Sequence, residues 1–214
     1  MTTLITGANR GIGRALFDHY TNAGAGVIGT ARSGDGFLPL EVTDPESQCA
    51  LAGALRGTAL DLLVCNAGIY PDKGQPLDTG YPAQMWADTF AVNVMGVFLT
   101  VQALLPNLRR AEGARIAIIS SQMASHTQAS GGSYIYRASK AAALNLGRNL
   151  AVDLKPDGIA VGIYHPGWVV TDMGGPSASI GPAEAAEGLA ARFAALSLAT
   201  TGCFETWDGR VHPY

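Results

Sequence analysis

The stretch that decides the fold is Thr6-Gly7-Ala8-Asn9-Arg10-Gly11-Ile12-Gly13. It follows a strand-like apolar run at 3–6 and opens a segment with helical spacing from 12 to about 22. Its glycines let the backbone turn sharply and come close to a ligand, because glycine has no Cβ. A helix that starts after such a turn presents unpaired N–H groups and a partial positive charge to a phosphate. The stretch therefore predicts a strand, a turn suited to the pyrophosphate of a dinucleotide, and a helix.

Outward from this turn, short apolar runs alternate with helical stretches. Nearly continuous apolar strands separated by helices are typical of a parallel sheet covered on both faces. We therefore expect one doubly wound α/β domain spanning residues 1–214, with residues 33–39 as a short loop. The expected strands are 3–6, 27–30, 60–65, 116–119, 160–164 and 203–207, and the expected helices are 12–22, 84–109, 134–154 and 182–196.

Composition excludes several classes of protein. Of 214 residues, 48% are hydrophobic and 14% are charged, and the net charge is -3, which is unlike a nucleic-acid-binding or a disordered chain. No uninterrupted apolar run approaches the roughly 20 residues that span a bilayer, and no signal peptide is expected at the start. Three scattered cysteines predict neither disulfides nor a metal site, so we expect a cytoplasmic protein. The motifs described below lead us to expect a small-molecule substrate as its partner.

The end of the second expected strand indicates the preferred dinucleotide. NAD-binding sheets place an acid there for the ribose 2′-OH, whereas this chain has Thr30-Ala31-Arg32. Arg32 can form a charge-assisted pair with a 2′-phosphate, and Arg10 can add a second cation. We therefore expect NADP(H), with NAD(H) as the alternative because Asp35 lies nearby in the sequence.

Tyr136 and Lys140 stand four residues apart in an expected helix, so their side chains share one face. A phenol ionises near pH 10, and a neighbouring ammonium lowers that pKa. We expect Lys140 to act on Tyr136 in this way, making the phenol a general acid toward a carbonyl or a base toward an alcohol. Upstream, the run 118–121 carries an apolar strand into two hydroxyls, Ser120 and Ser121, and Asn93 lies inside an expected helix where asparagine is unusual.

Five motifs in this order resemble the short-chain dehydrogenase/reductase family over essentially the whole chain. They are the turn at 6–13, Cys65-Asn66-Ala67-Gly68, Asn93, Ser121 with Tyr136 and Lys140, and the run 165–172. The resemblance implies a Rossmann-type sheet of about seven strands. It implies Tyr136 as proton donor, Lys140 on the nicotinamide ribose, Ser121 on the substrate oxygen and Asn93 on a relaying water. The implied cofactor-binding residues are Gly7, Asn9, Arg10, Gly11, Ile12, Gly13, Arg32, Glu41, Val42, Asn66, Ala67, Gly68, Tyr136, Lys140, Pro166, Gly167, Val169 and Thr171.

Within that family, the runs 131–140, 166–175 and 208–210 look most like the C-factor-like and sniffer-like carbonyl reductases. The chain also departs from the family pattern. Glu41 stands where an aspartate usually contacts the adenine. The gap of 15 residues between Ser121 and Tyr136 is longer than usual, so Ser120 stays a candidate for the serine role. The segment at about 172–182 is short for a substrate lid, which favours an open and permissive pocket.

The sequence thus predicts an NADPH-dependent reductase of a ketone or aldehyde. A protein that binds NADP(H) for redox sensing or signalling with little turnover is the alternative, and a lyase or epimerase on the same fold is a third. A homodimer formed by the helices at 84–109 and 134–154 is expected as in many relatives.

Overall fold

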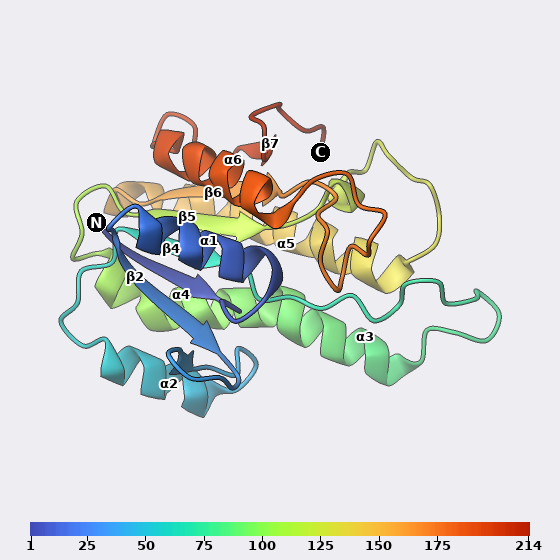
Figure 1. Cartoon of the computed structure of the whole chain (residues 1–214), viewed down its shortest axis with the longest axis horizontal. Coiled ribbons are helices and arrows are strands. Elements are labelled where there is room, and N and C mark those ends of the chain that lie inside the picture. Colours follow the sequence, from blue (N-terminus) through green and yellow to red (C-terminus); the bar gives the residue numbers. More distant parts are fainter.

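The computed structural model describes residues 1–214, and its strands form one parallel sheet (Figure 1). The first strand, β1, pairs with β2 on one side and with β4 on the other. The spatial order is β3-β2-β1-β4-β5-β6-β7, so the chain reverses its direction across the sheet between β1 and β4. The strands are β1 (Thr2–Thr6), β2 (Gly26–Ala31), β3 (Leu38–Pro39), β4 (Leu62–Cys65), β5 (Arg115–Ile119), β6 (Ala160–His165) and β7 (Phe204–Thr206).

Alternating side chains of the central strands build two core layers. Leu4 and Leu63 pack with buried residues of the helices on one face, whereas Ile5 and Val64, the next residue of each strand, pack on the other. Helices α2, α4 and α5 cover the first face, and α1 and α6 cover the second (Figure 1). The α-helices are α1 (Gly11–Asn22), α2 (Pro45–Ala54), α3 (Ala83–Phe90), α4 (Gly96–Leu108), α5 (Tyr134–Asp153) and α6 (Pro182–Ala195).

This architecture confirms the expected Rossmann-type sheet of seven parallel strands with helices on both faces. In such sheets ligands bind at the carboxyl ends of the strands, where the strand order reverses. The turn after β1, the turn after β4 and the start of α5 all lie toward that edge. The fold therefore places the predicted site residues along the edge of the sheet where such folds form their ligand-binding crevice.

The segment 33–54 differs from the sequence expectation. The expected loop ends in the two-residue strand β3, and α2 follows it. The start of α2 is marked in the sequence by Asp44 and Pro45, since Asp44 accepts a hydrogen bond from Glu46 N at 2.9 Å. Its apolar residues do not follow one helical stripe, so periodicity alone could not reveal this helix.

The expected helix at 84–109 is continuous from Ala83 to Leu108 but contains a π-helical segment, η1 (Ala91–Met95). At 26 residues it is, by length and composition, apolar enough to cross a membrane, although polar residues interrupt its apolar run. Its inner face is buried against α2, β4 and α5. These contacts make it a core helix of the domain.

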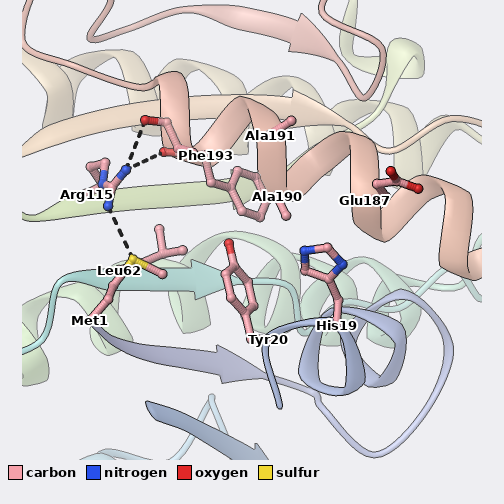
Figure 2. Close-up of a pocket in the computed structure, with 10 residues that line it drawn as sticks. Met1, His19, Tyr20, Leu62, Arg115, Glu187, Ala190, Ala191 and Phe193 are labelled. Atoms are coloured by element: carbon pink, nitrogen blue, oxygen red, sulfur yellow. Dashed lines mark hydrogen bonds between the residues drawn. The ribbon is translucent and has the colours of Figure 1, made fainter. Parts of the chain in front are cut away.

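A cavity of about 390 Å³ lies between α1 and α6 at the opposite edge of the sheet (Figure 2). Leu62 and Arg115, the first residues of β4 and β5, line it together with Tyr20 and Phe193. Arg115 donates to the carbonyls of Phe193 and Ala194 near the end of α6. The cavity therefore contains none of the predicted site residues.

Candidate active site

The glycine turn after β1 has the geometry expected of a phosphate-binding loop. Gly7 and Gly11 have φ of +66° and +55°, a region that favours glycine. A Cβ on Gly13 would lie 2.2 Å from the Gly7 carbonyl oxygen and 2.4 Å from Asn66 Nδ2, so no side chain fits there. Glycine at position 13 therefore lets the first turn of α1 pack tightly on the glycine turn and on Asn66.

The first turn of α1 keeps its N–H groups free. Its N-cap, Arg10, makes no side-chain cap, and its first turn holds no acidic residue. An anion placed here would meet unpaired donors and the positive end of the helix dipole. Asn9 is exposed and Ile12 is partly buried beside this terminus. The turn thus fits the pyrophosphate role predicted from the sequence.

Arg10 and Arg32, the two predicted 2′-phosphate ligands, have different surroundings. Arg32 follows β2, is exposed and makes no hydrogen bond or ion pair within the chain, so its guanidinium is free for a ligand. The Arg10 guanidinium instead lies 3.5 Å from the Asp172 carboxylate across the crevice. Arg32 is therefore the stronger of the two candidates.

Glu41 and Val42 lie on the same side of the crevice, after β3. The Glu41 carboxylate accepts hydrogen bonds from Thr43 N at 3.2 Å and Thr43 Oγ1 at 2.9 Å. Val42 packs against Gly96, where an added Cβ would lie 2.8 Å from the valine side chain. Both side chains are thus engaged within the protein, and Glu41 is held in its own turn.

Asn66, Ala67 and Gly68 join the end of β4 to the glycine turn. Asn66 Nδ2 donates to the carbonyls of Thr6 and Gly7, and the backbone N–H groups of Asn66 and Ala67 both donate to Thr6 Oγ1. A Cβ on Gly68 would lie 3.2 Å from Asn93 Oδ1 and 3.4 Å from Lys140 Nζ. Glycine at position 68 therefore leaves room beside this loop for both the Asn93 amide and the Lys140 ammonium.

Asn93 occupies the π-helical segment η1, a distortion that is frequent at functional sites. Its amide is paired with Ile69, accepting from the backbone N–H and donating to the carbonyl, both at 2.9 Å, and it also donates to Ser139 Oγ at 3.0 Å. The unusual interior asparagine therefore fastens the loop after β4 to α5.

Tyr136 and Lys140 are both buried in the first turns of α5, on one face as expected. Lys140 Nζ lies 5.7 Å from the Tyr136 ring centroid and donates to the Ile119 carbonyl at 2.9 Å. Burial lowers the pKa of Lys140 to about 8. Burial also raises the pKa of Tyr136 well above its usual range, and the charge of Asp72 adds to this rise.

The expected lowering of the Tyr136 pKa by Lys140 is therefore wrong for the protein by itself. Removing the phenol from water disfavours the phenolate more than the hydrogen bond from Ser121 favours it. The raised pKa favours Tyr136 as a proton donor over Tyr136 as a base, because the phenol keeps its proton at neutral pH.

The structure separates the two candidate serines. Ser120 Oγ is buried and donates to the Lys140 carbonyl at 3.0 Å. The Ser121 hydroxyl faces the Tyr136 phenol and favours its ionised form, while it accepts from Met123 N at 3.1 Å. The geometry thus places Ser121, and not Ser120, beside the tyrosine.

Two residues beside Tyr136 escaped sequence reasoning, Tyr70 and Asp72. The Tyr70 ring stacks on the Tyr136 ring with centroids 4.0 Å apart, and its hydroxyl lies 2.6 Å from Ser133 Oγ. Asp72 is fully buried and accepts hydrogen bonds from the backbone N–H groups of Ile135 and Tyr136. No local pattern marks either residue, since their partners lie more than 60 residues away.

The segment after β6 closes the crevice from the other side. Gly167 has φ of +88°, and a Cβ there would lie 2.5 Å from Ile180. The Thr171 side chain would be 3.5 Å from a Cβ on Gly11, so this segment faces the glycine turn. Pro166 and Val169 of this segment are buried.

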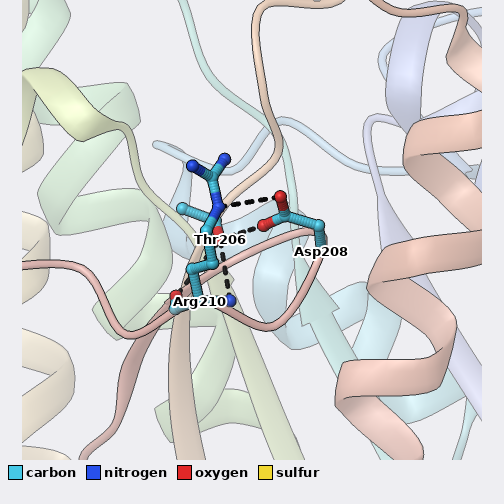
Figure 3. A network of polar contacts seen from close by, with 3 residues as sticks. All are labelled: Thr206, Asp208 and Arg210. Carbon is cyan, nitrogen blue, oxygen red and sulfur yellow. Dashed lines mark hydrogen bonds and ion pairs between the residues drawn. The ribbon is translucent and has the colours of Figure 1, made fainter.

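A turn after β7 supports the start of this segment (Figure 3). Thr206 Oγ1 donates to the Asp208 carboxylate, which also accepts from Arg210 Nε at 2.8 Å. His165 is buried beside this turn, and burial together with the nearby His212 and Arg210 lowers its pKa to about 4. His165 is therefore neutral at physiological pH.

Comparison with known proteins agrees with this geometry. The family model for short chain dehydrogenase matches residues 1–179. The C-signal protein of Myxococcus xanthus is 36% identical over 156 residues, which cover 72% of this chain and 93% of that protein. The NADPH-bound carbonyl reductase from chicken fatty liver is 31% identical with a TM-score of 0.91, covering 100% of this chain and 98% of that one. The carbonyl reductase Sniffer of D. melanogaster is 28% identical with a TM-score of 0.92, covering 100% and 99%.

The chain belongs to the short chain dehydrogenase family and is an oxidoreductase of that family. The relatives named carbonyl reductase agree with the subgroup that the sequence resembles.

Proposed function

We propose that this protein reduces a ketone or an aldehyde to an alcohol, reversibly, with NADPH as the hydride donor and Tyr136 as the proton donor. The observation that carries the proposal is the meeting of Tyr136, Ser121, Lys140 and Asn93 at the carboxyl edge of the sheet, in the crevice that holds the glycine turn. The similarity to an NADPH-bound carbonyl reductase supports it.

The residues of the crevice fit the dinucleotide. The glycine turn and the free N–H groups in the first turn of α1, which holds no acidic residue, would hold the pyrophosphate. Arg32 would pair with the 2′-phosphate, and the segment 166–171 would line the nicotinamide end. When bound, NADPH supplies the hydride that reduces the carbonyl carbon.

The chain's own residues would manage the proton. Ser121 donates a hydrogen bond to the substrate oxygen and holds it beside the phenol. Tyr136, kept protonated by burial, gives its proton to that oxygen as the alcohol forms. Lys140 holds the nicotinamide ribose, and its positive charge favours the phenolate left behind. Asn93, which approaches Lys140 across Gly68, anchors a water that returns the proton.

Replacement of Tyr136 by phenylalanine tests the proton donor. We expect Tyr136→Phe to lower kcat for carbonyl reduction by roughly a hundredfold or more, because the variant lacks the hydroxyl proposed to protonate the substrate oxygen. NADPH affinity, measured by fluorescence titration, should change little. A Tyr134→Phe variant is the matched control, because Tyr134 is exposed in the same helical turn. Full turnover in Tyr136→Phe would overturn the assignment.

Replacement of Arg32 tests the choice of cofactor. The Arg32→Ala variant should raise the KM for NADPH about tenfold or more and leave that for NADH nearly unchanged, since only NADPH carries the 2′-phosphate. Arg56→Ala, another exposed arginine away from the crevice, serves as the control. Equal losses for both dinucleotides would contradict the role of Arg32.

A second candidate function is a signalling protein that binds NADP(H) with little turnover, which the similarity to a protein named C-signal favours. Dinucleotide titration together with a panel of ketones and aldehydes separates the two. Tight binding without NADPH consumption would favour signalling.

Two features of the proposed enzyme follow from its surface. The segment at about 172–182 would act as a short lid, held by hydrogen bonds of Lys73 Nζ to the carbonyls of Met173 and Gly174 at 3.4 Å.

The exposed apolar side chains Trp86, Met95 and Phe98 of the long helix would become buried in the interface of a homodimer.

A further inference from the structure

The helix that carries Tyr136 has no cap of its own. Three residues with positive φ precede it, Gly131, Gly132 and Ser133, and the N-cap Ser133 makes no side-chain cap. The unpaired N–H groups of a first turn need partners when they are buried. The serine hydroxyl that could serve is instead hydrogen-bonded to Tyr70.

Asp72 supplies the missing partner from a distant part of the chain. Its Oδ2 accepts from Ile135 N at 2.8 Å and from the N–H of Tyr136 itself at 3.2 Å. Asp72 is 0% exposed, it forms no ion pair with a cation, and its Oδ1 has no hydrogen-bond partner. A buried carboxylate in this state is costly, so the positive end of α5 and these two donors must hold it.

We propose that Asp72 is a positioning residue of the active site: it fixes the first turn of α5, and with it Tyr136, to the loop after β4. The inference rests on the proposed role of Tyr136. Tyr70, on the same loop, stacks on the Tyr136 ring. This loop therefore positions the backbone of Tyr136 through Asp72 and the ring of Tyr136 through Tyr70.

The charge of Asp72 has a second effect on the same tyrosine. The groups that face the Tyr136 phenol are Tyr70 and Asp72 from the loop after β4, Ser121 from the end of β5 and Lys140 from α5. Burial is the main reason that the pKa of Tyr136 is raised, and the Asp72 carboxylate adds to the rise because it disfavours the phenolate. Removing the charge while keeping the cap should therefore move the pH profile without destroying activity.

Two variants of Asp72 separate position from charge. In Asp72→Ala the cap is lost, and we expect kcat to fall roughly tenfold to a hundredfold with little change in NADPH affinity, because the tyrosine is displaced. In Asp72→Asn the carbonyl oxygen still accepts a hydrogen bond, so most of kcat should return. The falling limb of the kcat profile for reduction should then shift toward lower pH, because the carboxylate no longer disfavours the phenolate.

Asp44 provides the matched control, because it caps α2 in the same way, through Glu46 N at 2.9 Å. The Asp44→Ala variant loses a cap of the same kind on a helix that bears none of the proposed catalytic residues, so its pH profile and kcat per folded molecule should match those of the wild type. A purely structural role of Asp72 would make Asp72→Ala behave like Asp44→Ala, and that result would overturn the proposal.

Hydrogen exchange gives a readout independent of turnover. In Asp72→Ala the amides of Ile135 and Tyr136 should exchange about tenfold faster than in wild type, and in Asp44→Ala they should not. Unchanged exchange at these amides would overturn the proposal even if the protein had no reductase activity. If the wild type has no reductase activity but Asp72→Ala shows the faster exchange, the proposed function is contradicted and the contact between Asp72 and α5 is still supported. If Asp72→Ala does not fold, Asp72→Asn decides: it keeps the hydrogen-bond acceptor, so a folded Asp72→Asn variant that loses kcat as completely as Tyr136→Phe does would count against the proposal.

Discussion

At the scale of single residues, the candidate site buries a lysine whose charged form is disfavoured by its surroundings. Lys140 is 5% exposed, forms no ion pair and donates to the Ile119 carbonyl. Burial lowers its pKa to about 8, against about 10.4 for a lysine in the unfolded chain. Below pH 8 the folded protein therefore holds a buried cation at a cost in stability.

Replacement of Lys140 by methionine should remove that cost. Between about pH 8 and 10.4 the unfolded chain binds more protons than the folded one, so wild-type stability rises with pH in this window. At pH 7 we expect Lys140→Met to be more stable by about 1–3 kcal/mol, after allowance for the lost hydrogen bond, and inactive. Urea unfolding at pH 7 and pH 10 measures this, and the gain should shrink at the higher pH. The Lys155→Met variant, at an exposed lysine, is the control and should leave the free energy of unfolding nearly unchanged. A Lys140→Met variant less stable than the wild type at pH 7 would contradict the prediction, because it would show that contacts within the protein offset the cost of burying the ammonium.

At the scale of elements, local patterns predicted what local forces determine. The glycine turn, the strands with continuous apolar runs and the helix bearing Tyr136 were all predicted close to their observed bounds, because each depends on residues within one segment. The helix α2 was missed because its apolar residues form no stripe, although Asp44 and Pro45 mark its start. The site followed the same rule: Tyr136 and Lys140 are four residues apart and were found, whereas Asp72 acts across 63 residues and was not.

The same reasoning explains the one expectation about chemistry that was wrong. The spacing of Tyr136 and Lys140 predicted their common face, which the structure contains. It could not predict that both would be buried, and burial decides the direction of both pKa shifts. A sequence motif identifies the pair, but the packing of the sheet, Tyr70 and Asp72 around it sets its proton affinity.

At the scale of the whole molecule, the parallel sheet gathers the carboxyl ends of its strands at one edge, and polar groups buried there couple stability to pH. His165 ends β6 and precedes the segment proposed to line the nicotinamide end. Burial lowers its pKa to about 4, whereas a histidine in the unfolded chain titrates near 6.5. The unfolded chain therefore binds an extra proton in the window between these two values, and acid favours unfolding.

The stability of the wild-type protein should accordingly fall as the pH is lowered from 6.5 to 4, by about 3 kcal/mol from this group alone. Acidic side chains titrate in part of the same window, so the informative quantity is the difference between wild type and a His165→Asn variant, measured by urea unfolding at pH 7, 5.5 and 4.5 without dinucleotide. The variant should lose less stability on acidification than the wild type, because its amide does not titrate. Exposed His126→Asn is the matched control and should follow the wild-type curve. Parallel curves for wild type and His165→Asn would mean that His165 takes up its proton equally well in the folded and the unfolded chain, and would contradict the lowered pKa.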